Sequence, residues 1–382
     1  MDALHACCAG LDVHKRTVVA CVRRVDPAGK VSKNIKTFAT MTRDLLNLSD
    51  WLAAQGVTTL AMESTGIYWK PVFNLLEPRF SVILVNAHHI KQVPGRKTDI
   101  KDSEWIAQLL QHGLLRPSFI PPRPTRELRD LTRQRTQLTA EKTAVANRIQ
   151  KVLEDANIKL GSVASNVLGV SGRDMIEAII RGEFDPVKLA DLARRRLRGK
   201  IPQLRVALQG SVTEHHRFLL RSLMDHLNHL ERMIRRFDER IEEALDPFAE
   251  RVGRLMTIPG VDRRVAEIVL AEIGREMVRF PTAGHLSSWA GLASGNHESA
   301  GKRQSGRTTP GNRWLKTALV QSAWAASRAK GTHLSRKFRR IAGSRGKKRA
   351  AVAVAHTLLV IIYHMLKEGT SYREIAEGNE AA

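Results

Sequence analysis

Four carboxylates in the first third of the chain have a spacing that could hold metal ions. Asp12 ends one apolar strand pattern, Glu63 ends another, and Asp99 and Asp102 stand three residues apart at a predicted helix start. The i, i+3 spacing places both aspartates on one helix face. Crowded carboxylates repel one another unless cations neutralise them, and such oxygen ligands suit Mg²⁺. Two Mg²⁺ ions about 4 Å apart can activate a nucleophile and stabilise a leaving oxygen in phosphodiester chemistry.

Two of the four acids also have a plain structural interpretation. Asp99 suits a helix N-cap, and Asp12 suits a turn in which the side chain bonds its own backbone. The metal interpretation gains weight because Asp12 and Glu63 end what would be the central strands of a sheet. A ribonuclease-H-like nuclease uses carboxylates at such a sheet end.

A glycine-rich loop at residues 295–316, GNHESAGKRQSGRTTPGNRWLK, holds a second chemical candidate, a serine. A serine hydroxyl alone is a poor nucleophile, but cations and metal-bound phosphate stabilise the charge that develops during attack on phosphorus. The sequence by itself favours a turn-forming role for these serines. The basic residues of the loop are predicted to contact nucleic acid: Lys302, Arg303, Arg307, Arg313 and Lys316.

Alternating strand and helix patterns in residues 1–116 would position the four acids. Strands are predicted at residues 5–11, 17–24, 33–38, 57–62 and 80–85. Helices are predicted at residues 43–55, capped by Thr42 and stopped by Gly56, at 68–76, and from 98 or 99 to about 112, stopped by Gly113. The order βββαβαβα implies a mixed sheet with an antiparallel hairpin followed by parallel crossovers.

Beyond residue 116 the pattern becomes helical. Prolines at positions 117, 121, 122 and 124 mark a domain boundary. Long helices at residues 125–156 and 214–245 carry a narrow apolar stripe, which predicts a helical hairpin or coiled coil with a dimer contact. Shorter helices fill residues 161–209, which include a basic run at 194–200, and Pro247 interrupts the second long helix. We therefore predict three parts, at residues 1–116, 117–250 and 251–382.

A Pro-Gly turn at residues 258–261 is predicted to join two helices of the third part. Such a turn, containing Gly260, exposes N–H groups at the next helix start and suits phosphate binding, so the segment resembles a helix-hairpin-helix module. A tight structural turn uses the same residues. Asp262 also places an acid near the supposed phosphate.

The charge of the chain points to a polyanionic partner. The 62 Lys and Arg exceed the 38 Asp and Glu, giving +24, and residues 300–350 contain fifteen basic residues and no acid. A solvated surface normally intersperses both signs, so this stretch predicts contact with a phosphate backbone in a salt-dependent manner.

The hydrophobic and cysteine patterns limit the classes of protein to which the chain can belong. The longest apolar stretch, residues 350–362, falls short of the roughly 20 residues of a membrane span, and no secretory signal is predicted. The three cysteines, Cys7, Cys8 and Cys21, cannot build a disulfide framework, and adjacent Cys7 and Cys8 are expected to be small core residues. We expect a cytoplasmic protein without a membrane partner.

Three strings give the sequence a specific resemblance. GLDVHK at residues 10–15, MESTGIYW at 62–69 and KTDIKDSEWIAQLL at 97–110 resemble the DEDD-type insertion-sequence transposases, relatives of the Piv and MooV DNA invertases. The resemblance implies a RuvC-like N-terminal domain in which Asp12, Glu63, Asp99 and Asp102 bind Mg²⁺. It covers most of the chain and is weakest at residues 161–209.

The third part resembles the transposase-20 domain of the same family. That resemblance implies a loop serine that attacks DNA and forms a covalent phosphoserine link, a role assigned to Ser299 in the ESAG string, with Ser305 as the reserve candidate. It also implies a composite active site formed between protomers of a dimer or tetramer. The partners it implies are target DNA, donor DNA and a structured noncoding RNA that pairs with both, which fits the absence of an obvious sequence-specific DNA-binding motif.

Two other functions remain open on the sequence. The same acids could serve a junction resolvase or nuclease that uses water and does not rejoin strands. Alternatively, the acids could be structural in a non-catalytic nucleic-acid-binding protein that cleaves no strand. The nuclease tolerates Ser299→Ala and leaves no protein–DNA adduct. In the binding protein, Asp12→Ala and Glu63→Ala change stability or nothing, and there is no Mg²⁺-dependent strand cleavage.

Overall fold

The computed structural model describes residues 3–63, 66–86, 102–274, 276–293, 297–299, 302–305, 308 and 310–373. The chain forms two compact units, Met1–Ile120 and Pro121–Ala382, which are described separately below. The predicted boundary at residues 116 and 117 lies close to the break between the units. The three-part division stays a prediction.

The first unit is built on a five-stranded mixed sheet. Its strands are β1 (Cys7–Val13), β2 (Thr17–Val25), β3 (Val31–Ala39), β4 (Thr59–Glu63) and β5 (Ser81–Val85), in the order β3-β2-β1-β4-β5. The pairs β1–β2 and β2–β3 are antiparallel, whereas β1–β4 and β4–β5 are parallel. The predicted mixed α/β architecture is therefore confirmed, with β1 and β4 at adjacent positions in the sheet.

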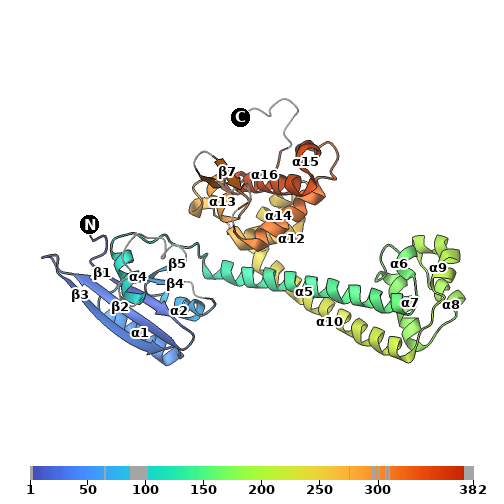
Figure 1. Cartoon of the computed structure of the whole chain (residues 1–382), viewed down its shortest axis with the longest axis horizontal. Helices are drawn as coiled ribbons and strands as arrows, with labels where there is room; N and C mark the ends of the chain where they lie inside the picture. Colours follow the sequence, from blue (N-terminus) through green and yellow to red (C-terminus); the bar gives the residue numbers. More distant parts are fainter. Residues whose placement is uncertain are drawn as a thin grey trace. The chain divides into compact units, whose positions relative to one another are not determined.

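Helices cover both faces of this sheet (Figure 1). On one face, α1 (Thr42–Ala54) and α2 (Trp69–Leu76) bury a core with alternate strand residues such as Leu11 and Met62. On the other face, α4 (Asp102–Gln111) packs on a smaller core that includes Cys8 and Ala61. The alternation follows from the two-residue period of a strand, so neighbouring residues of β1 and β4 belong to opposite faces.

Within the described residues, the predicted helix ends of the first unit agree with the structure except at the start of α1. Thr42 is the first residue of α1, and the N-cap position belongs to Met41, which makes no side-chain cap hydrogen bond. The stops at Gly56 and Gly113 are confirmed, because both glycines have the positive φ that favours glycine after a helix. The predicted start of α4 at Thr98 or Asp99 lies outside the described residues.

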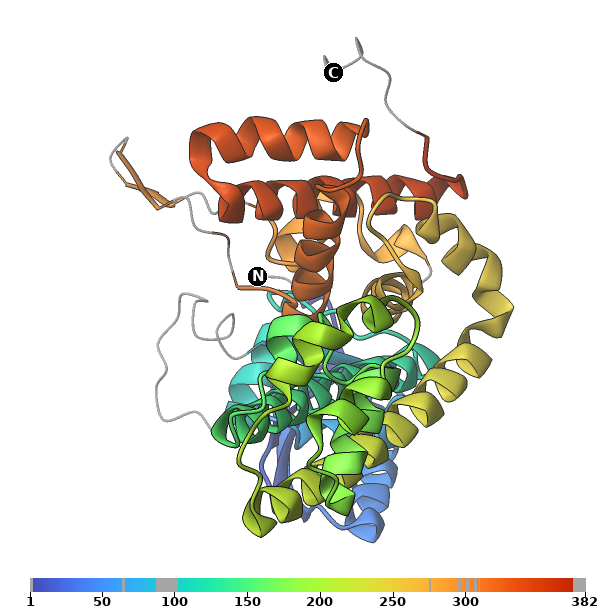
Figure 2. The ribbon, with the colours of Figure 1, turned by 90° about the vertical axis from the view of Figure 1, so that its right-hand side faces the viewer.

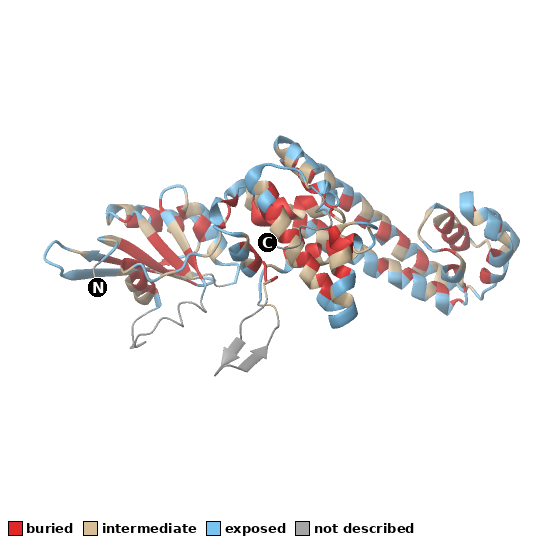
Figure 3. Ribbon diagram, turned by 90° about the horizontal axis from the view of Figure 1, so that it is seen from above, coloured by how far each residue is buried: buried red, intermediate tan, exposed pale blue. Residues whose placement is uncertain are grey.

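The second unit begins with a long helical hairpin. Helices α5 (Arg123–Asp155) and α10 (Glu214–Leu245) pack along each other, as predicted. Helix α5 starts before the last residue of the proline cluster, because Pro124 occupies the first turn, where a missing N–H breaks no helical hydrogen bond. The predicted stripe is buried at Leu128, Leu138, Val145 and Ile149, but Arg135 is also buried within it. Figure 3 shows the buried residues as a band between the two helices.

A small helical subdomain, here called the tip (residues 157–209), joins these two helices. It contains α6 (Leu160–Val163), α7 (Val170–Arg181), α8 (Pro186–Asp191), the 3₁₀ helix η1 (Arg195–Lys200) and α9 (Ile201–Ala207). Its core continues that of the hairpin through Met175, Ile179 and Leu204. The ends of the tip are tied by the N–H of Lys159, which donates to Ala207 O at 2.7 Å.

The remaining residues form a helical bundle on the other end of the hairpin. After η2 (Asp246–Phe248), which contains Pro247, come α11 (Ala249–Met256), α12 (Arg263–Ile273), η3 (Met277–Arg279), α13 (Ala283–Trp289), α14 (Arg313–Ala326), α15 (His333–Arg345) and α16 (Lys347–Glu368). Helices α15 and α16 lie side by side (Figure 2). The mostly α-helical character expected of this part is confirmed.

Helix α16 is long and apolar enough to cross a membrane by length and composition, contrary to the length estimate from the sequence. The estimate was short because the helix extends past residues 350–362 at both ends. In the bundle it contacts α11, α13, α14 and α15, with Leu358, Leu359 and Ile362 fully buried. Its apolar character therefore serves this core.

Candidate active site

The register of β1 and β4 brings two predicted ligands together. Leu11 pairs with Met62 in the parallel ladder, so the next step along both strands sets Asp12 beside Glu63. Leu11 and Met62 point into the core under α1 and α2, whereas Cys8 and Ala61 belong to the face covered by α4. Because strand residues alternate, Asp12 and Glu63 share the α4 face at the carboxyl ends of neighbouring strands.

A glycine in β1 allows α4 to bring the third acid close. A Cβ built on Gly10 would lie 2.2 Å from Ser103 O and 2.4 Å from Ala107 N, so the helix backbone lies directly against the strand. The far end of α4 lies near the start of β1, where the N–H of Leu4 donates to Gln111 O. The helix thus runs antiparallel to β1, and its first residue, Asp102, lies toward the end of β1 that carries Asp12.

The three described acids differ in how far they are exposed to solvent. Asp12 is 17% exposed, and its Oδ2 lies 3.0 Å from His14 Nε2. Asp102 is exposed, and Glu63 is half-buried. Within the described ranges, no group of three His, Cys, Asp or Glu side chains is arranged to hold a metal ion. The fourth predicted ligand, Asp99, lies outside those ranges.

The serine loop contains a two-stranded hairpin that its glycine-rich sequence did not predict. Strand β6 (His297–Ser299) pairs antiparallel with β7 (Lys302–Ser305). The register pairs Ser299 with Lys302, next to the connecting turn, and Ser305 with His297, at the opposite end. The two candidate nucleophiles therefore lie at different ends of the hairpin. Arg303 lies in β7, and Arg307 lies outside the described residues.

The base of this loop is closed by backbone packing. A Cβ on Gly311 would lie 2.2 Å from Gly291 N, so the chain entering the loop and the chain leaving it meet there. The N–H of Asn312 donates to Trp289 O at 3.3 Å, and the Asn312 side chain caps α14 by accepting from the N–H groups of Trp314 and Leu315. The two ends of the serine loop are thus held together at this base.

A buried carboxylate, Glu272, ties that base to α5. Glu272 is fully buried and accepts two hydrogen bonds from Arg133, Nε to Oε1 and Nη2 to Oε2, both at 2.7 Å. Asn312 Nδ2 donates to Oε2 of the same carboxylate at 2.6 Å. Arg129 donates to the carbonyls of Ala271 and Glu272 at the end of α12, and burial lowers its pKa to about 10, which keeps it charged at neutral pH.

A second buried ion pair fixes α12 to the hairpin. Arg135 donates to Glu267 Oε2 at 2.5 Å and to Asp238 Oδ1 at 3.0 Å, so it joins α5, α12 and α10. Arg135 and Glu267 are both buried. Heptad spacing alone did not predict this cluster, because the partners of Arg135 come from helices more than one hundred residues away in sequence.

Two of the predicted nucleic-acid contacts have defined surroundings at the start of α14. The Arg313 guanidinium lies 4.7 Å from the centre of the Trp314 ring, and Arg133 lies 5.7 Å from the same ring. Lys316 Nζ donates to Thr308 Oγ1 at 2.7 Å. Both residues follow the loop base directly, so the same cap that orients α14 positions them.

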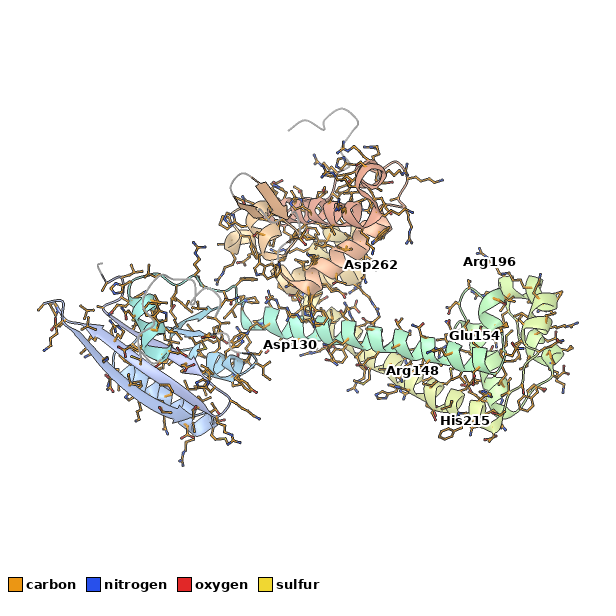
Figure 4. The ribbon with its side chains drawn as sticks, in the orientation of Figure 1. Asp130, Arg148, Glu154, Arg196, His215 and Asp262 are labelled. Atoms are coloured by element: carbon orange, nitrogen blue, oxygen red, sulfur yellow. The ribbon has the colours of Figure 1, made fainter. Side chains whose placement is uncertain are left out.

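The Pro-Gly turn has a packing role in the structure. Gly260 has a φ of +87°, and a Cβ there would lie 2.5 Å from Ser322 O and 2.6 Å from Ala326 N of α14. The N–H of Val261 donates to Ile258 O, and Asp262 (Figure 4) caps α12 by accepting from Val265 N. Phosphate binding at Gly260 stays a prediction.

Sequence reasoning gave no role to His14, Arg133, Glu272 or Asn312. His14 had a usable signal, because it stands two residues after Asp12 in the sequence, close enough for its imidazole to reach that carboxylate. The other three come together only through the packing of α5, α12 and α14. Neither helical periodicity nor a motif joins them.

Two models of transposase families match parts of the chain. A transposase model of the IS110 DEDD type matches residues 9–158, and a model described as the transposase IS116/IS110/IS902 family matches residues 252–339. Together they span more than half of the 382 residues. The first match includes the four acids, and the second includes Ser299, Ser305 and the loop base.

Curated relatives agree with these matches. The chain is 29% identical over 303 residues to an insertion element IS110 uncharacterized 43.6 kDa protein of Streptomyces coelicolor, covering 73% of each chain. It is 27% identical over 154 residues to the pilin gene-inverting proteins of Moraxella bovis and Moraxella lacunata, covering 39% of this chain and 48% of each of theirs. Such transposases and recombinases process DNA. This chain belongs to the IS110/IS116/IS902 family of transposases.

Proposed function

We propose that this transposase cleaves and rejoins DNA strands through a covalent phosphoserine intermediate at Ser299, with divalent metal ions held by Asp12, Glu63, Asp99 and Asp102. The observation that carries the metal site is the shared face and edge of Asp12, Glu63 and Asp102. The strand order β3-β2-β1-β4-β5 supports the further proposal that the first unit is ribonuclease-H-like, as in RuvC.

The donor set suits Mg²⁺. Carboxylate oxygens are hard ligands, and Mg²⁺ typically uses one or two carboxylates together with substrate phosphate oxygens. When bound, two such ions would polarise the scissile phosphate and stabilise the leaving oxygen. The contribution of the chain is to hold its carboxylates at one sheet edge, with the spacing set by the β1–β4 ladder and by the α4–Gly10 contact.

The proposed serine chemistry is a balanced transesterification. The Ser299 hydroxyl loses its proton to solvent, its Oγ forms a bond to phosphorus, and the phosphorus–oxygen bond of the DNA strand breaks. The leaving oxygen takes up a proton from solvent and becomes a free hydroxyl end. A hydroxyl end from another strand then attacks the same phosphorus and releases the serine. The loop cations Lys302, Arg303 and Arg307 are proposed to bind the surrounding phosphates, as are Arg313 and Lys316.

A denaturation-resistant adduct tests this chemistry. DNA labelled at one end is incubated with Mg²⁺ and the protein, and adducts are separated under denaturing conditions. The proposal expects an adduct with wild-type protein and with Ser305→Ala, and none with Ser299→Ala. An adduct lost only in Ser305→Ala moves the nucleophile to Ser305. Cleavage without any adduct supports a water-using nuclease, and the absence of Mg²⁺-dependent cleavage supports a non-catalytic binding protein.

A guide RNA is the second part of the proposal. The formal charge of +24 suits polyanionic partners, and base pairing by a structured noncoding RNA would select target and donor DNA while the protein contacts backbones. Sequencing the RNA that copurifies with the protein tests this, with an element-flanking transcript as the expected result. Protein freed of RNA that still recombines the correct sites would overturn it.

We further propose that the protein assembles as a homodimer and then a homotetramer in the cytoplasm, and that acids of one protomer act with Ser299 of another. Mixing Asp12→Ala protein with Ser299→Ala protein tests the shared site. Recovery of strand exchange in the mixture is expected, because each variant then supplies the group that the other lacks. No recovery in mixed assemblies would place both groups in one chain.

A further inference from the structure

All but the first two residues of the tip lie between the two family-model matches, and the tip carries a large cationic cavity. The cavity has a volume of about 990 Å³. It is formed by the segment between α6 and α7, the first turn of α7, and the basic run that becomes η1. Thirteen residues line it, and four of these are basic: Arg194, Arg195, Arg196 and Lys200.

The basic residues of the cavity are unequally paired. Arg194 forms an ion pair with Asp174 at 2.7 Å, and Lys200 Nζ donates to Val163 O at 2.9 Å. Arg195 and Arg196 are exposed, and no ion pair joins either to an acid in the described part of the chain. Figure 4 draws Arg196 at the outer edge of the tip. Two guanidinium groups are therefore available to an external anion.

The backbone of Arg195 adds an independent observation. Its φ is +51°, a left-handed conformation that is uncommon for a bulky residue other than glycine. Such strain persists only where the surrounding structure holds it, and it concentrates at ligand-binding positions. Here the N–H of neighbouring Arg194 donates to the buried Ser171 Oγ at 2.9 Å, which anchors the start of the basic run to α7.

The rest of the lining favours a ligand with both anionic and apolar parts. Val163, Val170 and Leu197 contribute apolar surface, and Gly169, the N-cap of α7, places no side chain over the first turn of that helix. Helix N-termini attract phosphate oxygens, and guanidinium groups bind them through paired N–H donors. A nucleic-acid strand offers phosphates for the arginines and sugar or base faces for the apolar surface.

We propose that the tip cavity is a binding site for the phosphodiester backbone of nucleic acid, with Arg195 and Arg196 as its principal phosphate contacts. This site is separate from the proposed catalytic residues and would anchor a distal segment of the bound nucleic acid. RNA and DNA share the recognised chemistry, so the test contains both. An acidic segment of a second copy of the chain is the competing occupant.

A charge-matched pair of double variants tests the site. Arg195→Gln/Arg196→Gln removes the two unpaired cavity cations, whereas Lys188→Gln/Arg205→Gln removes two exposed cations of the same tip that face Glu183 at 3.5 Å and Asp191 at 3.6 Å. Affinities for a 30-base-pair DNA duplex and for an RNA stem-loop are measured by fluorescence anisotropy across a salt series in EDTA. The chelator removes catalysis from the readout, so this test stays separate from that of the phosphoserine.

The salt dependence decides the outcome. Losing two phosphate contacts lowers the slope of log K against log salt by about 1.8 for duplex DNA or about 1.4 for a single strand. The proposal expects this loss in the cavity variant with DNA, RNA or both, and an unchanged slope in the control. Equal losses in both variants, or none in the cavity variant, would overturn it. So would an altered oligomeric state with an unchanged slope, because that outcome identifies the second copy as the occupant.

Thermal melting of all proteins verifies the fold. All four substituted side chains are exposed, so the melting temperatures of both double variants should stay close to that of the wild type. A photo-crosslink provides the second measurement. Oligonucleotides with 4-thiouridine or 5-bromodeoxyuridine should crosslink to residues 163–200 in the wild type and in the control but not in the cavity variant. Crosslinks absent from this segment in the wild type would count against the site.

Discussion

Arg133 of α5 holds the fully buried carboxylate of Glu272 through two parallel hydrogen bonds of 2.7 Å, and Asn312 at the base of the serine loop binds the same carboxylate. One acid thus connects the long hairpin, α12 and the loop. Paired N–H donors and a buried site make such contacts directional, so the position of the loop base depends on α5.

Glu272→Ala should destabilise the second unit by roughly 3–5 kcal/mol, because Arg133 and Asn312 lose a common buried partner. Urea unfolding followed by circular dichroism measures the change. Glu243→Ala is the control, since Glu243 and Arg240 form an exposed pair on α10 that should be worth less than about 1 kcal/mol. Similar effects in the two variants would contradict a special role for the buried pair.

Gly10→Ala should displace α4 from β1 and destabilise the first unit by about 1–3 kcal/mol or more, because the new Cβ meets helix backbone at 2.2 and 2.4 Å. DNA cleavage should fall as well, because this contact brings Asp102 to the sheet edge that carries Asp12. Gly253→Ala in α11 is the control. A Cβ there meets nothing within 4 Å, so the same change should stabilise by about 0.5–1 kcal/mol.

Asp12→Asn and Glu63→Gln should each lower Mg²⁺-dependent cleavage at least about a hundredfold, because a metal ligand contributes several kcal/mol to the transition state. Single-turnover cleavage across a Mg²⁺ series measures this effect. Glu104→Gln provides a matched acid on α4, whose carboxylate binds Lys33 at 3.0 Å and lies 3.7 Å from Arg23. It should leave the Mg²⁺ dependence unchanged, and a shift equal to that of Glu63→Gln would argue against a dedicated metal set.

The buried thiols should make the first unit lose stability at high pH. Burial raises the pKa of Cys8 to about 12 and that of Cys21 to about 11, whereas an unfolded thiol ionises near about 8.5. The folded state therefore binds more protons between these values. Stability is fully present below about pH 8.5 and falls above it by up to about 1.4 kcal/mol per pH unit for each thiol.

Urea unfolding of the wild type and of Cys8→Ala/Cys21→Ala between pH 8 and pH 11 measures the loss of stability that the two thiols cause. The double variant should show a shallower decline with pH, although its absolute stability will differ. Parallel declines would show that other groups cause the loss. A thiol reagent at pH 8 should modify Cys7 faster than the other two cysteines in the native protein, because Cys7 is partly exposed.

Gly260→Ala separates packing from phosphate binding at the Pro-Gly turn. The positive φ and the backbone atoms of α14 within 2.6 Å predict a loss of roughly 1–3 kcal/mol in stability. A purely packing role also predicts an unchanged salt slope for DNA binding at temperatures where the variant is folded. A slope lowered by about 0.9 or more would restore Gly260 to the phosphate contacts.

Local patterns of the sequence were sufficient for the elements of the first unit. β-Branched runs, helical periodicity and the glycine stops at Gly56 and Gly113 predicted the described strand and helix ends to within a few residues, because these signals act between near neighbours. The predicted start of α4 lies outside the described residues. The predicted cap and boundary were wrong at two positions, where neighbouring residues compete for the same role. Met41 rather than Thr42 precedes α1, and Pro124 lies inside the first turn of α5.

For the residues of the proposed chemistry, too, the sequence determined one part and the tertiary structure another. Their types and motifs named Asp12, Glu63, Asp102 and Ser299 from the sequence alone, but only the parallel register of β1 with β4 and the missing side chain at Gly10 brought the described acids to one edge. The hairpin register that separates Ser299 from Ser305 is likewise a tertiary result. The Arg133–Glu272–Asn312 cluster and the tip cavity join residues from distant segments. Helix packing decided these features, because no local spacing specifies which buried charges will meet.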